Sequence, residues 1–127
     1  MSNKLQTEAQ RWLEEKYKDM DFRTYQRVAE STAIYPEQHK ILYPALGLAG
    51  EAGEVANKVK KLIRDGFENA PKDWREQIAS EIGDVLWYCA ALASDLNINL
   101  SQIASDNERK LTRRKQEGKL GGSGDDR

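Results

Sequence analysis

Apolar positions along the chain recur at helical spacing, and two segments repeat one pattern. Residues 51–55 read EAGEV, and residues 81–85 read EIGDV. At about 100° of rotation per residue, each segment belongs to an apolar stripe on one side of a helix. The first stripe comprises Leu48, Ala52, Val55, Val59 and Leu62, and the second comprises Ile78, Ile82, Val85, Cys89 and Leu92. The repeat predicts two amphipathic helices of the same design.

Start and stop signals place further helices around this pair. Tyr35-Pro36 breaks the chain, because a proline disfavours the helical conformation in the residue before it, and Asp65-Gly66 is a common helix end. Helices are expected over about 4–18, 22–33, from 38 or 45 to 64, 72–96, and from 99 or 101 to about 117. No run alternates with the period of a strand. The fold class predicted is all-α, a four- to five-helix bundle with an antiparallel central helix pair.

Acidic residues flank both stripes on the same side. Glu51 and Glu54 edge the first stripe, and Glu81 and Asp84 edge the second. The first pair lies ~17 Å before its helix ends and the second lies ~14 Å after its helix begins, at about 1.5 Å per residue. An antiparallel hairpin therefore brings all four carboxylates to one level.

Four carboxylates at such short distances raise one another's pKa, and a bound divalent cation relieves their electrostatic repulsion. All-oxygen ligands favour a hard ion, Mg²⁺ first and Mn²⁺ as a substitute. The alternative is that each acidic pair is only the solvated face of its helix. Glycines at 47, 50 and 53 disfavour the first helix by roughly 0.5–1 kcal/mol each relative to alanine. Their lack of a side chain would let a neighbouring helix or a ligand approach the backbone.

Length, charge and composition narrow the class of protein. A chain of 127 residues with a formal charge of −1 suggests a single folded domain, with no field that attracts a nucleic acid polymer or an anionic membrane. One cysteine excludes an internal disulfide and a cysteine-built zinc site. No stretch resembles a signal peptide or a membrane span, so a cytoplasmic location is expected. We expect three parts: a helical extension over 1–20, a helical domain over 21–117 and a glycine-rich tail over 118–127.

The two acidic motifs carry a resemblance to a known family. The pattern ExxE, a gap of 26 residues and then ExxD is similar to the signature of the MazG-like all-α nucleoside triphosphate pyrophosphohydrolases. The segments LGLAGEAGEVANKVKK, EIGDVLWYCAALA and GSGDDR resemble the small single-domain members. Many members open the first motif with two glutamates, whereas this chain has Gly50. The resemblance implies Mg²⁺-dependent hydrolysis of a nucleoside triphosphate to the monophosphate and pyrophosphate, as in housecleaning of the nucleotide pool.

The resemblance also implies residue roles. Glu51, Glu54, Glu81 and Asp84 become metal ligands, with Glu51 as the candidate general base. Tyr88, four residues after Asp84, is a candidate to stack on the base or sugar, although core packing explains it equally well. The candidate phosphate contacts are Asn107, Lys110 and Arg114 on one face of the last helix, with Lys58 and Lys61 on the acidic side of the central pair. Those cations have simpler alternatives, namely charge–dipole contacts at a helix end and ordinary i, i+4 pairing.

Members of the family are dimers or tetramers, so self-association is expected together with a nucleoside triphosphate as substrate. Two other classes compete with this interpretation. A di-iron bundle needs ExxH pairs, and the single histidine, His39, does not follow a glutamate by three residues. A non-catalytic helical oligomerisation module with a solvated acidic face is the stronger alternative.

Overall fold

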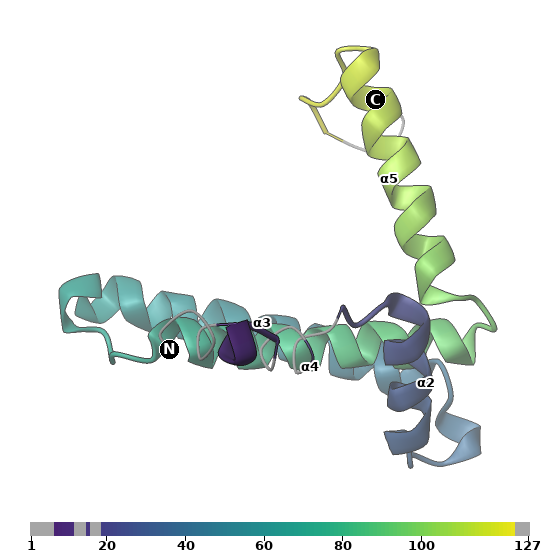
Figure 1. Cartoon of the computed structure of the whole chain (residues 1–127), viewed down its shortest axis with the longest axis horizontal. Helices are drawn as coiled ribbons and strands as arrows, with labels where there is room; N and C mark the ends of the chain where they lie inside the picture. The colour runs from purple at the N-terminus through teal and green to yellow at the C-terminus, as the bar shows by residue number, and fades with distance from the viewer. Residues whose placement is uncertain (1–6, 12–14, 16–18, 124–127) are drawn as a thin grey trace.

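The computed structural model describes residues 7–11, 15 and 19–123, and this part of the chain contains helices and no strand (Figure 1). The all-α prediction is therefore confirmed. The helices are α2 (Phe22–Thr32), α3 (Leu42–Asp65), α4 (Trp74–Asp95) and α5 (Leu100–Gln116), with short 3-10 turns η1 (Glu37–His39) and η2 (Phe67–Asn69). Of the helix expected over 4–18, residues 7–11 and Glu15 are helical. The rest of that segment, and positions 124–127 of the tail, lie outside the described residues.

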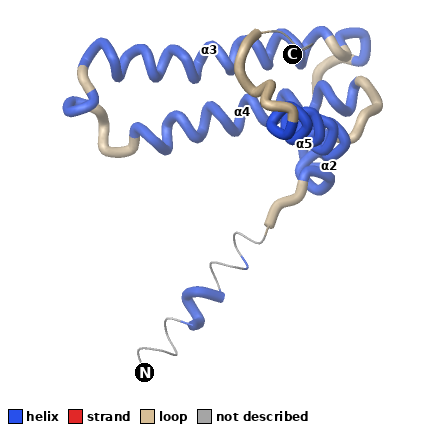
Figure 2. The backbone as a smooth tube through the Cα atoms, turned by 90° about the horizontal axis from the view of Figure 1, so that it is seen from above, coloured by secondary structure: helices blue, strands red, loops and turns tan. Residues whose placement is uncertain are grey.

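Helices α3 and α4 form the predicted antiparallel hairpin and lie side by side in both views (Figures 1 and 2). Most of the two apolar stripes face each other along the hairpin, and Leu62 is buried. The stripes were predicted too wide, because Ala52 and Ile82 are exposed, Ile82 to 54%. Ile82 lies about 100° around α4 from Glu81, which turns it out of the seam.

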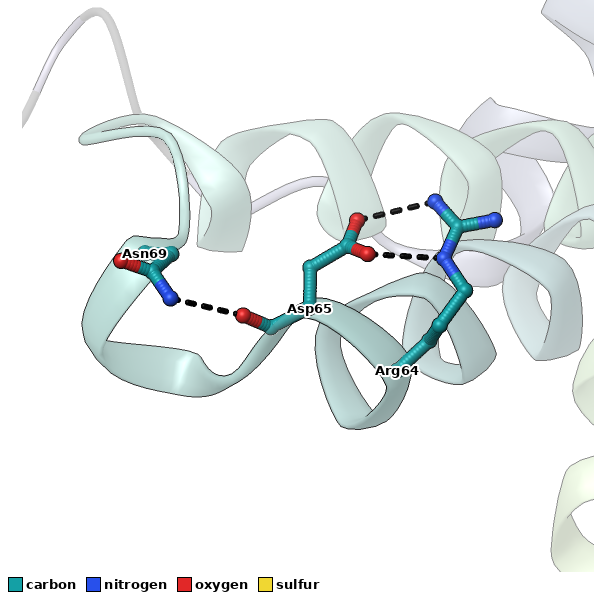
Figure 3. Close-up of polar contacts among 3 residues, drawn as sticks. All are labelled: Arg64, Asp65 and Asn69. Atoms are coloured by element: carbon teal, nitrogen blue, oxygen red, sulfur yellow. Dashed lines mark hydrogen bonds and ion pairs between the residues drawn. The ribbon is translucent and has the colours of Figure 1, made fainter.

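The hairpin turns where α3 ends at Asp65 (Figure 3). Gly66 follows with φ of +87°, a conformation that glycine adopts without the steric penalty of a side chain. The amide Nδ2 of Asn69 donates to the carbonyl of Asp65 at 2.8 Å, and Arg64 donates two hydrogen bonds to the Asp65 carboxylate. The bond from Asn69 satisfies a carbonyl at the end of α3 and holds the connection that leads to α4.

At the opposite end of the hairpin, α2 packs across α4 and contacts the start of α5. The core there consists of three alanines, Ala29, Ala90 and Ala93, together with Leu100, and Tyr25, Trp87 and Cys89 pack against it. Alanines let helices approach closely, and the Trp87 indole N–H adds a hydrogen bond to Thr32 Oγ1 at 2.8 Å. This end is the packed part of the molecule.

Two polar side chains, Gln26 and Asp95, join the elements of this packed end through hydrogen bonds. Gln26 of α2 is buried, and its amide accepts from the Leu100 N–H at 2.8 Å and donates to the Ile98 carbonyl at 2.9 Å. Asp95 Oδ2 accepts from the Tyr35 hydroxyl and from the Ile41 N–H, both at 2.8 Å. Ile41 has φ of +69°, an unfavourable angle for a β-branched residue that the hydrogen bond to Asp95 offsets.

Helix α5 leads away from the hairpin, as both views show (Figures 1 and 2). Its first turn contacts α2 and α4, after a connection in which Asn97 has φ of +56°. Large apolar side chains stay exposed on several elements, among them Leu46, Ile63, Ile82 and Leu86. Within the described residues, no helix has both the length and the apolarity that crossing a bilayer requires.

Candidate metal centre

Three carboxylates from the two central helices meet on one side of the hairpin. Each of Glu51, Glu81 and Asp84 offers an oxygen, and these oxygens all lie within 4.8 Å of one another. Glu51 comes from α3 and the other two come from α4, so the antiparallel register creates the cluster. We call this side of the hairpin the acidic face.

The spacing and chemistry of the cluster suit a hard cation. Oxygens on opposite sides of a magnesium ion lie about 4.2 Å apart, because each Mg–O bond is about 2.1 Å. The three donors are carboxylates, and the helices hold their backbones in place. Small side-chain rotations would bring the oxygens to coordination distance.

A lysine already contacts the cluster. Lys58 Nζ lies 3.4 Å from Glu81 Oε1, and both side chains are largely shielded from solvent, at 31% and 18% exposure. The ion pair offsets part of the negative charge that two helices bring together. It also places a cation beside any group bound at the carboxylates.

The surroundings of Glu51 raise the proton affinity of its carboxylate. Loss of contact with water raises the pKa of Glu51 above its ordinary value, and the charges of Asp84, Glu81 and Glu54 raise it further. A raised pKa means that Glu51 accepts a proton more readily than an isolated glutamate. This is the electrostatic property that a general base requires.

Glu54 is placed differently from the other three acids. It is exposed, and its oxygens are not among those within 4.8 Å of one another. Its charge still contributes to the raised pKa of Glu51, so it lies within electrostatic reach of the cluster. The structure therefore brings together three of the four acidic residues selected from the sequence, with the fourth at the margin.

Tyr88 bounds the acidic cluster on the side of the packed end. Its ring packs edge-on against Trp87, with centroids 5.0 Å apart, and near Tyr43 at 6.4 Å. Burial raises the pKa of Tyr88, and the charges of Glu51 and Asp84 add to the effect, so the phenol lies near the carboxylates. Of the glycines at 47, 50 and 53, only Gly47 has a close neighbour among the described residues: an added Cβ would overlap the Tyr88 ring.

A hollow of about 230 Å³ adjoins the cluster toward the turn of the hairpin. Its lining includes Lys58, Lys61, Asn69, Trp74 and Gln77. Gln77 precedes Glu81 by one helical turn on the same side of α4, which connects the hollow to the carboxylates. We call it the tip hollow.

The polar and aromatic groups that Asn69, Trp74 and Gln77 bring to the tip hollow were not among the candidates selected from the sequence. Trp74 sits at the start of α4 and packs edge-on against Phe67 of η2, with ring centroids 5.6 Å apart. Asn69 belongs to the connection, whose path the apolar pattern does not specify. Gln77 was within reach of sequence reasoning, since it lies four residues before an acidic residue of the motif.

The candidate phosphate contacts on α5 are not joined to the cluster within one chain. Asn107 is exposed and Lys110 is half-buried, on a helix that leads away from the α3–α4 hairpin (Figure 1). Arg114, at 3% exposure, is buried at the far end of α5. The folded chain thus presents the predicted carboxylates and the predicted α5 groups on separate surfaces.

Comparison with known proteins points to one family. Residues 39–118 match the MazG nucleotide pyrophosphohydrolase domain. The chain is also 44% identical over 109 residues to the Gene 37 protein of Mycobacterium phage L5, covering 81% of this chain and 96% of that protein. No solved structure matches the chain.

The described residues form an all-α fold, and the domain that they match is of the nucleotide pyrophosphohydrolase class. The chain belongs to the MazG nucleotide pyrophosphohydrolase family, because the match to that domain spans most of it. The family resemblance drawn from the two acidic motifs is thereby confirmed.

Proposed function

We propose that this protein is a Mg²⁺-dependent nucleoside triphosphate pyrophosphohydrolase, which converts a nucleoside triphosphate and water to the monophosphate and pyrophosphate. One observation carries the proposal: the oxygens of Glu51, Glu81 and Asp84 gather within 4.8 Å on facing helices. Membership of the MazG family supports a nucleotide as substrate. Mn²⁺ is expected to replace Mg²⁺, because both are hard ions that accept carboxylate oxygens.

In this proposal Glu51, Glu81 and Asp84 hold the metal, and Glu54 adds a further ligand by rotating toward them. Bound Mg²⁺ would neutralise phosphate charge and make a water molecule more acidic. Glu51 would take a proton from the attacking water through a carboxylate oxygen that is not used to hold the metal. The water oxygen forms a bond to the α-phosphorus while the bond from that phosphorus to the bridging oxygen breaks, and pyrophosphate leaves.

The neighbouring side chains suggest how the substrate lies. Lys58 is next to Glu81 and Lys61 is one turn farther along α3, so both can contact phosphate oxygens. The tip hollow then accommodates the nucleoside, with Trp74 as an aromatic wall and the amides of Asn69 and Gln77 as hydrogen-bonding groups. Tyr88 bounds the opposite side of the metal centre.

Self-association is part of the proposal. Ile82 and Leu86 each lie two residues from Asp84, hence about 160° around α4 from it, and they are 54% and 37% exposed. A second hairpin packed on this apolar side would bury them and form a four-helix bundle. In a dimer or tetramer of this kind, Asn107 and Lys110 of one copy would act at the carboxylates of another, whereas Arg114 is buried within its own copy.

Pyrophosphate release tests the reaction. Each common ribo- and deoxyribonucleoside triphosphate is incubated with the protein and Mg²⁺, and pyrophosphate and monophosphate are measured. We expect equal amounts of both products from at least one nucleotide and none when EDTA replaces Mg²⁺. Absence of turnover across the panel, or release of orthophosphate instead, would favour a non-catalytic helical module or another reaction.

Mixing of variants tests whether copies share a site. Glu81→Gln and Lys110→Gln variants are each assayed alone and then after refolding together. If α5 acts on a neighbouring copy, a hybrid dimer of the two variants has one intact site out of two. Half of the randomly formed dimers are hybrids, so activity returns to about a quarter of the wild-type value. No recovery would show that each copy uses its own groups.

A further inference from the structure

A second hollow lies at the packed end of the molecule, apart from the carboxylates. It measures about 610 Å³ and is formed by α2 together with the connection between α4 and α5. Its lining is polar: Arg23, Gln26, Arg27, Glu30, Ser94, Asn97, Ile98 and Asn99. Hollows that hold small molecules commonly measure about 300–1,000 Å³. We call this one the corner hollow.

Two arginines supply its charge. Arg23 and Arg27 are four residues apart and therefore neighbours on one face of α2. Neither guanidinium forms an ion pair within the described part of the chain, and both side chains are exposed. Glu30, the acidic residue of the lining, lies one turn beyond Arg27. The hollow thus has two cations and one anion, with guanidinium groups available for an incoming ligand.

The floor of the hollow is fixed by hydrogen bonds. Gln26, between the two arginines in the sequence, is 7% exposed and joins α2 to the opposite wall. Its Nε2 donates to Ser94 Oγ at 3.1 Å and to the Ile98 carbonyl at 2.9 Å, and its Oε1 accepts from the Leu100 N–H. The walls are therefore held at a constant separation before any ligand arrives.

The opposite wall offers neutral donors. Asn97 and Asn99 both line the hollow, and neither side chain forms a hydrogen bond within the described residues. Asn99 is also the N-cap of α5, where it makes no side-chain cap bond. The 17-residue α5 thus begins beside the hollow, and the positive end of its dipole adds to the field of the two arginines.

We propose that the corner hollow binds the phosphate group of a small phosphorylated molecule. Arg23 and Arg27 would hold the phosphate through charge-assisted hydrogen bonds, for which guanidinium groups are well shaped. The amides of Asn97 and Asn99 would contact the rest of the ligand. Ser94 follows Asp84 by ten residues, about 15 Å along α4, so this site is separate from the metal centre. The inference stands independently of the proposed hydrolysis.

Calorimetric titration without metal tests the site. The full-length protein in EDTA is titrated at low ionic strength with inorganic phosphate, pyrophosphate and a nucleoside monophosphate in separate runs. We expect one ligand bound per chain, and the tightest of the three identifies the source of the phosphate group. The Arg23→Gln/Arg27→Gln variant should bind at least about tenfold more weakly, because it loses both charge-assisted contacts to the phosphate.

A control variant that loses the same amount of charge elsewhere distinguishes a specific phosphate site from general electrostatic attraction. Lys72→Gln/Arg109→Gln removes two exposed cations away from the corner hollow and should bind like the wild type. The single variants Arg23→Gln and Arg27→Gln give intermediate affinities if the double variant unfolds. Equal weakening in the control pair, unchanged binding in the arginine variants, or no binding of any of the three ligands by the wild type would overturn the proposal.

Discussion

The two ends of the α3–α4 hairpin differ in what covers them. Where α4 ends, α2 and α5 pack on it, and Ala90 and Ala93 are almost fully buried. Toward the turn, the hairpin has no further helix packed on it within the described residues, and the carboxylates and the tip hollow lie there. One end provides stability and the other leaves polar groups open to a ligand. Substitutions at the two ends should therefore have different consequences.

The largest expected effect is the loss of a carboxylate at the open end. Glu81→Gln removes a proposed metal ligand and the partner of Lys58 while keeping the shape of the side chain. Loss of residues that only support a metal ligand typically costs 10–100-fold, so a ligand itself should cost at least about 100-fold in kcat/KM. The rate of pyrophosphate release with Mg²⁺ measures the effect.

Glu76→Gln is the matched control, because Glu76 is an exposed glutamate near the start of the same helix. It should retain wild-type activity, and both variants should keep the helical circular dichroism of the parent. A Glu81→Gln enzyme with undiminished kcat/KM would remove the acidic face from the mechanism.

A smaller effect is expected where the open and packed ends meet. Gly47→Ala places a methyl group against the Tyr88 ring, and such overpacking typically costs about 1–3 kcal/mol. Gly50→Ala meets nothing within 4 Å and should instead stabilise α3 by roughly 0.5–1 kcal/mol. Urea unfolding of both variants decides the point. Equal stability changes of the same sign would show that Tyr88 does not lie on Gly47.

The smallest effect concerns pH at the metal-free acidic face. Because the pKa of Glu51 is raised in the folded chain, the folded state binds that proton more tightly than the unfolded state does. Stability should fall relative to Glu51→Gln as pH rises from the ordinary value of 4.5 through the raised pKa. Unfolding midpoints in EDTA across this range measure the difference, and parallel curves would contradict the assignment.

Periodicity predicted the helices well because apolar spacing is a local property. The observed bounds of α2, α3, α4 and α5 fall within a few residues of the expected ranges, and α5 begins at Leu100, between the two expected starts. Counting residues to the turn also predicted correctly that Glu51 lies at the same height along the hairpin as Glu81 and Asp84. A hairpin leaves little freedom once its turn is located.

The remaining features depend on contacts distant in the sequence. The hydrogen bonds of Asp95 to Tyr35 and Ile41 bridge more than fifty residues, and no periodic pattern signals them. The buried amide of Gln26 is a second example, because its hydrogen bonds join α2 to the end of α4 and to the α4–α5 connection, about seventy residues away. The direction of α5 depends on this connection, so the separation of Asn107 and Lys110 from the carboxylates was beyond sequence reasoning.

Metal binding tests the central claim most directly. Mn²⁺ is titrated into the wild type and into Glu51→Gln/Glu81→Gln/Asp84→Asn, and the free ion is followed by its electron paramagnetic resonance signal. The account predicts at least one Mn²⁺ bound per wild-type chain, displaced by Mg²⁺, and no stoichiometric binding by the triple variant. A wild type that leaves all Mn²⁺ free, or a folded triple variant that binds it equally well, would contradict the claim that these carboxylates jointly hold a cation.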